Sequence, residues 1–166
     1  RQGLLFPFTT PEGIYHCAGD KRLSSASPTL TFVSYSGAGG MNGEQSGLSV
    51  KSMSAIVNPS DKYVYVEESD PRQYNMGSWI ISMGAGSNWI DPVAPWHNDY
   101  STLSWADGHA TTKKWLSENT KKAARNTVGT PSRPGTFSFG FYDKDNRDIM
   151  YMKEHYATNR KSGNAL

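Results

Sequence analysis

Three residues near the middle of the chain, His97, Asp107 and His109, have side chains that could do chemistry together. Asp107-Gly108 suits a two-residue type I′ turn, because both central residues of that turn need a positive φ. A hairpin folded there would bring Asp107 and His109 close, with His97 just before its first strand. Imidazole and carboxylate groups bind zinc or move protons, but the trio lacks the close spacing of established zinc motifs. The pattern therefore favours a structural role, in which His97, Asp107 and Gly108 shape and anchor the hairpin, over a metal or catalytic site.

Carboxylates gather in a second stretch, at Glu67, Glu68 and Asp70, close to Arg72. Glycoside hydrolysis needs two carboxyl groups roughly 5 to 9.5 Å apart. Adjacent residues of a strand point to opposite faces of a sheet, so Glu67 and Glu68 should not form such a pair with each other. We expect this stretch to be a salt-bridged loop.

A third group of oxygen-bearing side chains lies near the C-terminus, at Asp143, Asp145, Asn146 and Asp148. Carboxylate and amide oxygens suit Ca²⁺. The run lacks the glycine and the final glutamate of an EF-hand loop, so a solvated turn is the simpler interpretation. Calcium is the one cofactor that the sequence suggests, and none is certain.

The chain is rich in aromatic residues, with 5 Trp, 9 Tyr and 6 Phe. Four of them are expected in or beside loops, where their rings could stack on sugars or on neighbouring subunits: Trp79, Trp89, Trp96 and Tyr100. The same rings could instead fill the core, because aliphatic residues are few. The single cysteine, Cys17, excludes an intrachain disulfide, and we expect it to be a small buried apolar residue.

The elements that position these residues are expected to be short strands and two helices. Aromatic and β-branched residues from 100 to 115 predict a central hairpin, in which Leu103 would face Thr112 and Tyr100 would face Trp115. Further strands are predicted at 13–17, 30–35, 62–67 and 76–82, and the glycine-rich stretch 36–46 is predicted to be a loop. The predicted helices are 116–127, with Ser117 as N-cap, and 148–156, with Ile149, Met152 and Tyr156 on one face.

Composition limits the classes of function. A chain of 166 residues fits one domain. The net charge is only +2, and Lys and Arg are scattered, so the dense basic stripe of a nucleic-acid-binding protein is missing. No stretch approaches the roughly 18 to 20 apolar residues that span a bilayer. Charged residues make up only 19%, which favours an extracytoplasmic location.

His97, nine further residues, and then Asp107-Gly108 form a pattern that resembles the His-x9-Asp-Gly motif of bacterial prepilin-like proteins, the type II secretion-type pseudopilins. Other segments resemble that family's motifs in the expected order and span about residues 3–156. They are Gly3-Leu-Leu-Phe-Pro-Phe8, Tyr15-His-Cys17 with Asp20, Ser34-Tyr35, Asn42-Gly43, Asn58-Pro59-Ser60, Glu67-Glu68 and the stretch 148–156. Ala18 stands where the family usually has proline.

The resemblance implies an α+β fold: a pilin-like head with a central antiparallel β-sheet, short helices and long loops. Residues 1–166 would form this single domain, with a frayed tail at about 157–166. It also implies a non-enzymatic subunit of a type II secretion-type pseudopilus or type IV-like surface filament, which acts by packing against sister subunits. The family's Gly-Phe-Thr-Leu-Ile-Glu stretch and its long apolar helix do not occur in this sequence. We therefore expect the full-length precursor to carry an inner-membrane anchor and to hold the head outside the cytoplasm.

Two other functions stay open at this point. One is an extracytoplasmic carbohydrate-binding module, in which the aromatic residues near loops would contact sugars. The other is a carbohydrate-active enzyme that uses a carboxylate from Glu67, Glu68 or Asp107.

Overall fold

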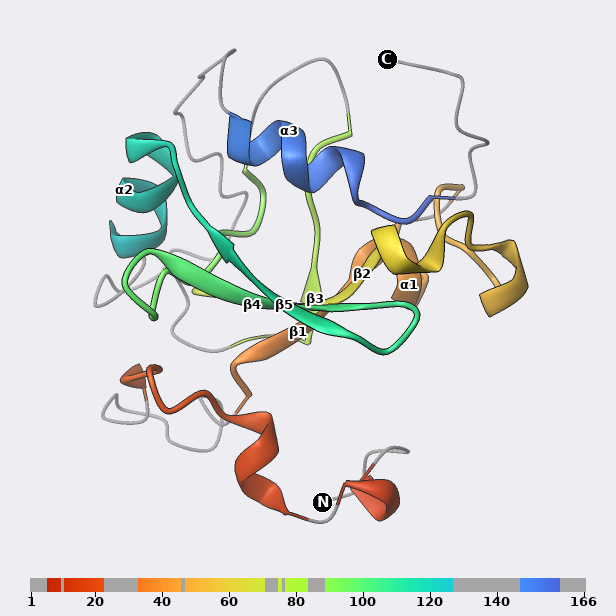
Figure 1. Ribbon diagram of the computed structural model, residues 1–166, viewed down its shortest axis with the longest axis horizontal. Helices are drawn as coiled ribbons and strands as arrows, with labels where there is room; N and C mark the ends of the chain where they lie inside the picture. Colours follow the sequence, from red (N-terminus) through yellow and green to blue (C-terminus); the bar gives the residue numbers. More distant parts are fainter. Residues whose placement is uncertain are drawn as a thin grey trace.

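A five-stranded mixed β-sheet lies at the centre of an α+β fold (Figure 1). The structure is a computed structural model, and it describes residues 6–9, 11–22, 33–45, 47–70, 75, 77–83, 89–126 and 147–158. The strands are β1 (Tyr35–Ala38), β2 (Tyr63–Glu67), β3 (Ser78–Trp79), β4 (Tyr100–Trp105) and β5 (Ala110–Lys114), in the order β3-β1-β2-β4-β5. All neighbours are antiparallel except β1 and β3, which are parallel, so the central sheet expected to be antiparallel is a mixed one.

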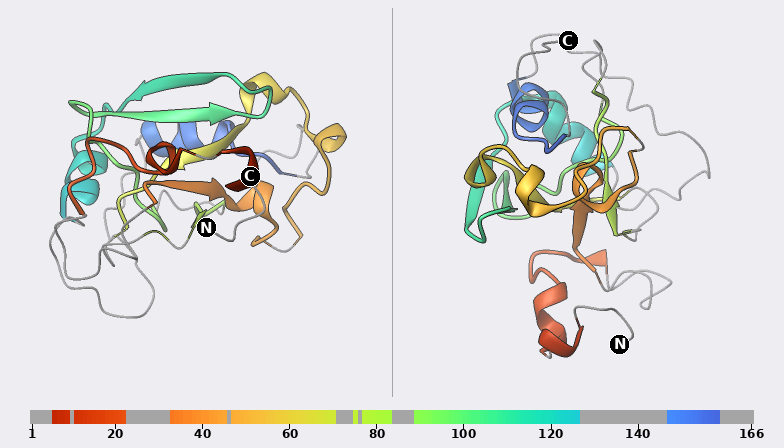
Figure 2. Two further views of the ribbon diagram at one scale, coloured as in Figure 1. Left: turned by 90° about the horizontal axis from the view of Figure 1, so that it is seen from below. Right: turned by 90° about the vertical axis from the view of Figure 1, so that its right-hand side faces the viewer.

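The helices lie around this sheet rather than in a separate layer of their own. They are α1 (Gly39–Asn42), α2 (Glu118–Asn126) and α3 (Arg147–Glu154), with 3₁₀ turns η1 (Phe6–Phe8), η2 (Glu12–Tyr15), η4 (Met53–Ala55) and η5 (Pro59–Asp61). Helix α3 lies over one side of the sheet, and residues 11–22, here called the N-terminal segment, lie on the opposite side (Figures 1 and 2). Among the described helices, none has the length and apolar character that a membrane crossing requires.

The main core fills the space between the sheet and α3. The α3 face predicted from the sequence is confirmed, because Ile149, Met152 and Tyr156 are all buried there. Four aromatic contacts, close to edge-on, run through this core: Tyr63–Trp79, Tyr63–Tyr156, Trp79–Trp89 and Trp89–Trp115, with centroids 5.7 to 6.3 Å apart. Edge-to-face packing of this kind adds to the energy of simple burial. Aromatic rings thus replace the scarce aliphatic residues.

The sequence predicted three of the elements near their observed bounds. Strand β2 matches the expected strand 62–67, and α2 and α3 match the two expected helices. Ser117 directly precedes α2, and its carbonyl oxygen accepts a hydrogen bond from the Lys121 N–H. The expected strand 76–82 is present only as the short β3 and an isolated bridge at Ile81.

The central hairpin forms, but its register differs by one residue from the predicted one. Leu103 faces Thr111 and Tyr100 faces Lys114. The loop has three residues, because the Gly108 N–H donates to the Trp105 carbonyl and the Trp105 N–H donates to the His109 carbonyl. Gly108 has a φ of +97°, the left-handed conformation that closes such a loop with a bulge.

The two-residue turn with positive φ lies instead at the other end of β4. Asn98 and Asp99 have φ of 55° and 68°, and His97 and Tyr100 exchange both backbone hydrogen bonds. These are the features of a type I′ turn. Asparagine and aspartate adopt this conformation more easily than other non-glycine residues, which explains the turn's position.

Strand β1 and helix α1 lie where a glycine loop was predicted. The glycines there are needed for close packing. A Cβ on Gly40 would lie 1.9 Å from the Ala157 carbonyl oxygen, and a Cβ on Gly39 would lie 2.5 Å from Ile80 Cγ2. Ala157 is itself buried, so the chain is packed at least to that residue, whereas 159–166 lie outside the described residues.

Two further predictions concern strands in the N-terminal third. Residues 12–15 form the 3₁₀ turn η2, so the strand predicted at 13–17 is wrong. Of the strand predicted at 30–35, residues 30–32 lie outside the described residues, residues 33 and 34 are not in a strand, and β1 begins only at Tyr35.

Candidate functional site

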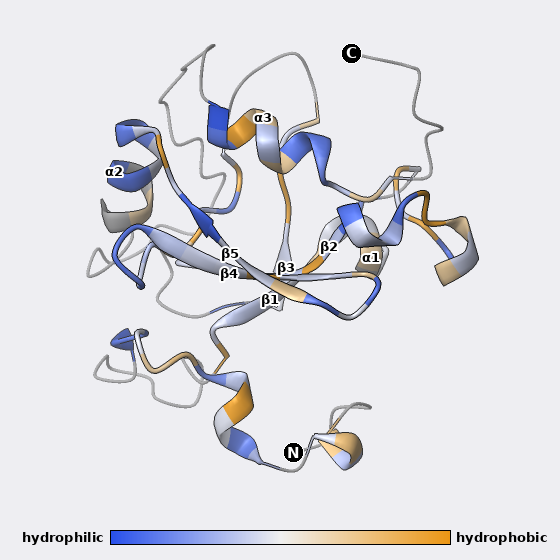
Figure 3. Cartoon of the chain, viewed as in Figure 1, coloured by the Kyte–Doolittle hydropathy of each residue, from blue (hydrophilic) through white to orange (hydrophobic). Residues whose placement is uncertain are grey.

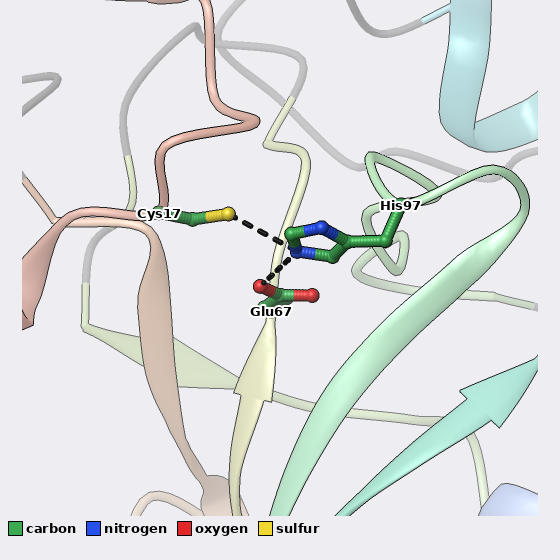
Figure 4. A group of neighbouring side chains, drawn as sticks. All are labelled: Cys17, Glu67 and His97. Atoms are coloured by element: carbon green, nitrogen blue, oxygen red, sulfur yellow. Dashed lines mark hydrogen bonds and ion pairs between the residues drawn. The ribbon is translucent and has the colours of Figure 1, made fainter.

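Three side chains from distant parts of the chain meet on the side of the sheet away from α3 (Figure 4). Cys17 comes from the N-terminal segment, Glu67 ends β2, and His97 lies in the turn before β4. His97 Nε2 is 3.2 Å from Cys17 Sγ and 3.0 Å from Glu67 Oε1. One donor atom from each residue lies within 4.8 Å of the other two. This cluster is the candidate functional site.

The alternation of β2 positions Glu67. Val66 points into the core beneath α3, and successive strand residues point to opposite faces, so Glu67 points toward the N-terminal segment. Its side chain has no solvent exposure. The Thr102 N–H donates to Glu67 Oε2 at 2.7 Å, which holds the carboxylate with Oε1 toward His97. Glu67 is therefore a fixed, buried acceptor at the base of the site.

The type I′ turn at Asn98-Asp99 positions His97. The reciprocal backbone bonds between His97 and Tyr100 fix the start of the turn. The imidazole reaches over Glu67, and 42% of the His97 side chain stays exposed. His97 is therefore the member of the cluster that faces solvent.

Cys17 is buried and is held by its own backbone. Its N–H donates to Ser34 Oγ at 3.0 Å, and the Gly19 N–H donates to Cys17 Sγ at 3.3 Å. Burial raises the pKa of the Cys17 thiol, the Gly19 N–H opposes this, and the Glu67 carboxylate raises the pKa further. Because the pKa is raised above its ordinary value, the thiol is protonated at neutral pH.

A buried ion pair supports the cluster from the side. Arg22 Nε and Nη2 donate to both oxygens of Asp20, at 2.6 to 3.1 Å, and Ser34 Oγ donates to Asp20 Oδ2 at 2.7 Å. Burial alone would raise the pKa of Asp20, but the hydrogen bonds and charge of Arg22 outweigh it and lower the pKa. The Arg22 guanidinium also lies 5.1 Å from the centre of the Trp96 ring. The N-terminal segment is thereby stiffened where it carries Cys17.

The structure does not bring His97, Asp107 and His109 together. His97 precedes β4, whereas Asp107 and His109 lie in the hairpin loop after it. Asp107 Oδ1 contacts His109 Nδ1 at 2.5 Å and accepts a hydrogen bond from its backbone N–H, at an exposed position. These contacts and the positive φ of Gly108 agree with the structural role predicted for the Asp-Gly pair.

The aromatic residues considered for sugar binding divide into two kinds. Trp79 and Trp89 are buried in the core, which is the alternative that the sequence left open for them, and they present no ring to a ligand. Trp96 and Tyr100 are half-buried at the surface, where Arg22 and Lys114 lie over their rings. An exposed four-ring platform is therefore not formed.

The predicted calcium ligands can be placed only in part. Asp143, Asp145 and Asn146 lie outside the described residues. Asp148 is buried, and its carboxylate accepts hydrogen bonds from the backbone N–H groups of Leu116 and Ser117 and from Lys113 Nζ. These donors give Asp148 a structural role at the start of α3, and the calcium site stays a prediction.

Glu68 and Asp70, the other acids of the predicted salt-bridged loop, are buried, and Arg72 is not among the described residues. Glu67 is the last residue of β2, and Glu68 follows it in an isolated bridge to Val93.

Comparisons with protein-family models, with curated proteins and with solved structures found no match for this chain. The resemblance of its motifs to prepilin-like proteins therefore remains a hypothesis. Every residue of the cluster nevertheless lies within a motif that carries the resemblance: Cys17 in Tyr15-His-Cys17, Glu67 in Glu67-Glu68, and His97 at the head of His-x9-Asp-Gly. Reasoning from the sequence did not predict that Cys17, Glu67 and His97 lie together, because 30 to 80 residues separate them along the chain.

Proposed function

We propose that this domain is the head of a non-enzymatic, prepilin-like subunit of a type II secretion-type pseudopilus or type IV-like surface filament. The observation that supports this proposal best is the joining of the motif segments. Cys17, Ser34, Glu67 and His97 form one network of hydrogen bonds between the N-terminal segment and the sheet. Hydrogen bonds between motif residues that hold separate elements together are expected in a protein whose function is structural.

In a filament, mechanical force reaches a head of this kind through its N-terminal side. In the proposed subunit a long apolar helix precedes the head, anchors it in the inner membrane, and packs in the filament. Any pull on that helix reaches the sheet through the N-terminal segment. The network at Cys17 and the backbone bond from the Ser34 N–H to the Tyr15 carbonyl give that segment two attachments to the chain around β1 and β2. The proposal places the head outside the cytoplasm.

The same side of the molecule offers apolar groups for packing. Phe8 is 84% exposed in η1 and Ile14 is 51% exposed in η2. Single exposed apolar residues are common and need no explanation, but two large ones on successive turns suit a subunit contact. Sister subunits, rather than a nucleic acid or a small molecule, are the proposed partners.

Site-specific photocross-linking of the full-length precursor tests the proposal. A photoreactive amino acid at Phe8 should give adducts between sister subunits when the precursor is expressed with its cognate secretion or filament machinery. The same group at Glu154, an exposed residue of α3 on the other side of the sheet, is the matched control and should give fewer. The precursor should also be shortened by a prepilin peptidase. A precursor that is neither shortened nor cross-linked to its sister subunits would overturn the proposal.

A further inference from the structure

The candidate site gathers three types of metal ligand that elsewhere in proteins hold first-row transition metals. A thiol, an imidazole and a carboxylate converge with Nε2 at 3.2 Å from Sγ and at 3.0 Å from Oε1 (Figure 4). Four-coordinate zinc uses these ligand atoms, with Zn–S distances of about 2.3 Å and Zn–N and Zn–O distances of about 2.0 to 2.2 Å. Such bonds set neighbouring ligand atoms roughly 3.3 to 3.6 Å apart. The observed separations fall a few tenths of an ångström short of that range.

The geometry argues against a nucleophilic cysteine assisted by a proton relay. In a relay, the nucleophile contacts one nitrogen of the imidazole and the acid contacts the other, so that the ring passes a proton between them. Here Sγ and Oε1 both approach Nε2. The ring cannot link them in series, and the three atoms converge on one point instead. Convergence on a point is the arrangement that a cation requires.

The surroundings hold the three ligand atoms in place. The Thr102 N–H fixes the free oxygen of Glu67, and the Gly19 N–H donates to Cys17 Sγ. Hydrogen bonds of this kind orient metal ligands and stabilise their charge. Gly19 itself is closely surrounded: a Cβ there would lie 3.0 Å from Trp96 Cβ and 3.5 Å from both Cys17 Sγ and His97 Cε1. The loop therefore approaches the site as closely as a backbone can.

From this arrangement we infer that Cys17, Glu67 and His97 form a binding site for a divalent transition metal of the zinc class. The thiol releases its proton to solvent as the sulfur–metal bond forms, and the thiolate and carboxylate together balance the charge of the ion. Hard ions such as Ca²⁺ and Mg²⁺ prefer all-oxygen ligands and are not selected here. Because His97 is partly exposed, a water molecule can complete the coordination from its side.

Cobalt substitution tests the site directly, because the chain has a single cysteine. The untagged protein is freed of metal with a chelator, kept reduced with a phosphine, and titrated with Co²⁺. We expect one equivalent to produce a sulfur-to-cobalt charge-transfer band in the near ultraviolet and intense visible bands of tetrahedral Co²⁺. Added Zn²⁺ should remove these bands at a ratio of one per chain. A titration without the charge-transfer band would overturn the inference, since any thiolate coordination must come from Cys17.

Variants locate the ion. Cys17→Ser should abolish the charge-transfer band, and Glu67→Gln and His97→Gln should each weaken Zn²⁺ binding at least tenfold in competition with a chromogenic chelator. His109→Gln is the matched control, because His109 is an exposed histidine beside a carboxylate and lies outside the cluster. Its affinity for Zn²⁺ should equal that of the wild type. Stoichiometric Zn²⁺ binding that survives Cys17→Ser, or that is lost in His109→Gln, would place the ion elsewhere and refute the site.

Discussion

At the scale of single residues, the pair Asp20–Arg22 shows how a short segment can hold buried charge. Both side chains are almost fully buried, and they satisfy each other and Ser34. A buried ion pair adds little net stability compared with apolar residues of the same size, but removal of one member leaves the other uncompensated. The pair therefore fixes the conformation of the N-terminal segment more than it stabilises the fold.

Neutralising Asp20 should be costly. Asp20→Asn leaves the Arg22 guanidinium buried without its counter-charge, and we expect a loss of about 3 kcal/mol in the free energy of unfolding. Urea denaturation followed by tryptophan fluorescence measures it. Asp107→Asn is the control, because the pKa of Asp107 is also lowered, by the hydrogen bond with His109, but at an exposed position. Equal losses in the two variants would contradict the importance of burial.

The same residue predicts the direction of a pH effect. Because the folded state lowers the pKa of Asp20, folding favours its ionised form. The stability that it contributes is fully present above the unfolded pKa, about 3.9, and is lost as the pH falls through the lower folded value. Denaturation curves measured from pH 6 down to pH 2 should show this loss in the wild type. In Asp20→Asn the free energy of unfolding should fall less steeply with decreasing pH. A fall as steep as in the wild type would mean that other acids cause it.

At the scale of elements, the sequence correctly predicted those elements whose formation depends on a local residue pattern. Strand β2 and helices α2 and α3 have clear periodicity, and each was found near its expected bounds. Helix α1, which follows β1, was missed because its glycines Gly39 and Gly40 reflect contacts with Ile80 and Ala157, which are distant in sequence. The hairpin register was missed because Asp-Gly suits both two- and three-residue loops, and only the pairing with β4 selects between them.

Gly40 tests the claim that close packing places glycine at the start of α1. Gly40→Ala would bring a Cβ to 1.9 Å from the Ala157 carbonyl oxygen, and backbone must move to relieve it. We expect the variant to lose roughly 1 to 3 kcal/mol of stability, or more, as overpacked cores do. Gly13→Ala is the matched control, since nothing lies within 4 Å of its added Cβ. Thermal unfolding should show a clear decrease in melting temperature for Gly40→Ala and none for Gly13→Ala. An unchanged melting temperature of Gly40→Ala would show that the backbone at Ala157 is free to move.

Asp148 joins two helices at their starts. Its carboxylate, on the first turn of α3, accepts the N–H groups of Leu116 and Ser117, which lead into α2. Asp148→Ala should cost about 2 to 4 kcal/mol, because two backbone donors and Lys113 lose a buried acceptor. Glu118→Ala, which removes an exposed acid paired with Lys121, should cost under about 1 kcal/mol. Chemical denaturation in excess EDTA separates this structural loss from any effect of calcium, and comparable losses would contradict the assigned role.

At the scale of the whole molecule, the candidate site depends on tertiary structure. Considered alone, Cys17 is a single cysteine that follows His16 without a recognisable catalytic or metal motif, and Glu67 is one acid among several. The sequence reasoning placed His97 just before the first strand of the hairpin but grouped it with Asp107 and His109, which lie beyond the other end of β4. Only the packing of the N-terminal segment on the sheet brings the three ligand atoms together. The three residues lie in three separate motifs, and a single sequence gives no distances between motifs.

The packing of that segment gives a last prediction. The N-terminal segment is attached through Ser34, which receives the Cys17 N–H and donates its own N–H to the Tyr15 carbonyl, and through the contact of Cys17 with His97. Removal of one attachment should open the segment locally without unfolding the sheet. In His97→Ala we expect faster amide hydrogen exchange across residues 15–22, measured by mass spectrometry, and unchanged exchange in β2 and β4.

His109→Ala is the control for this experiment, because it removes an exposed imidazole from the hairpin loop while leaving His97 in place. Its exchange at residues 15–22 should match the wild type. Equal acceleration in β2 and β4 of His97→Ala would mean that the contact stabilises the whole fold and does not act as a local attachment. If Zn²⁺ slows exchange at residues 15–22 in the wild type and not in His97→Ala, then the attachment and the metal site are the same group of atoms. The strength with which this segment is held would then depend on the supply of the ion.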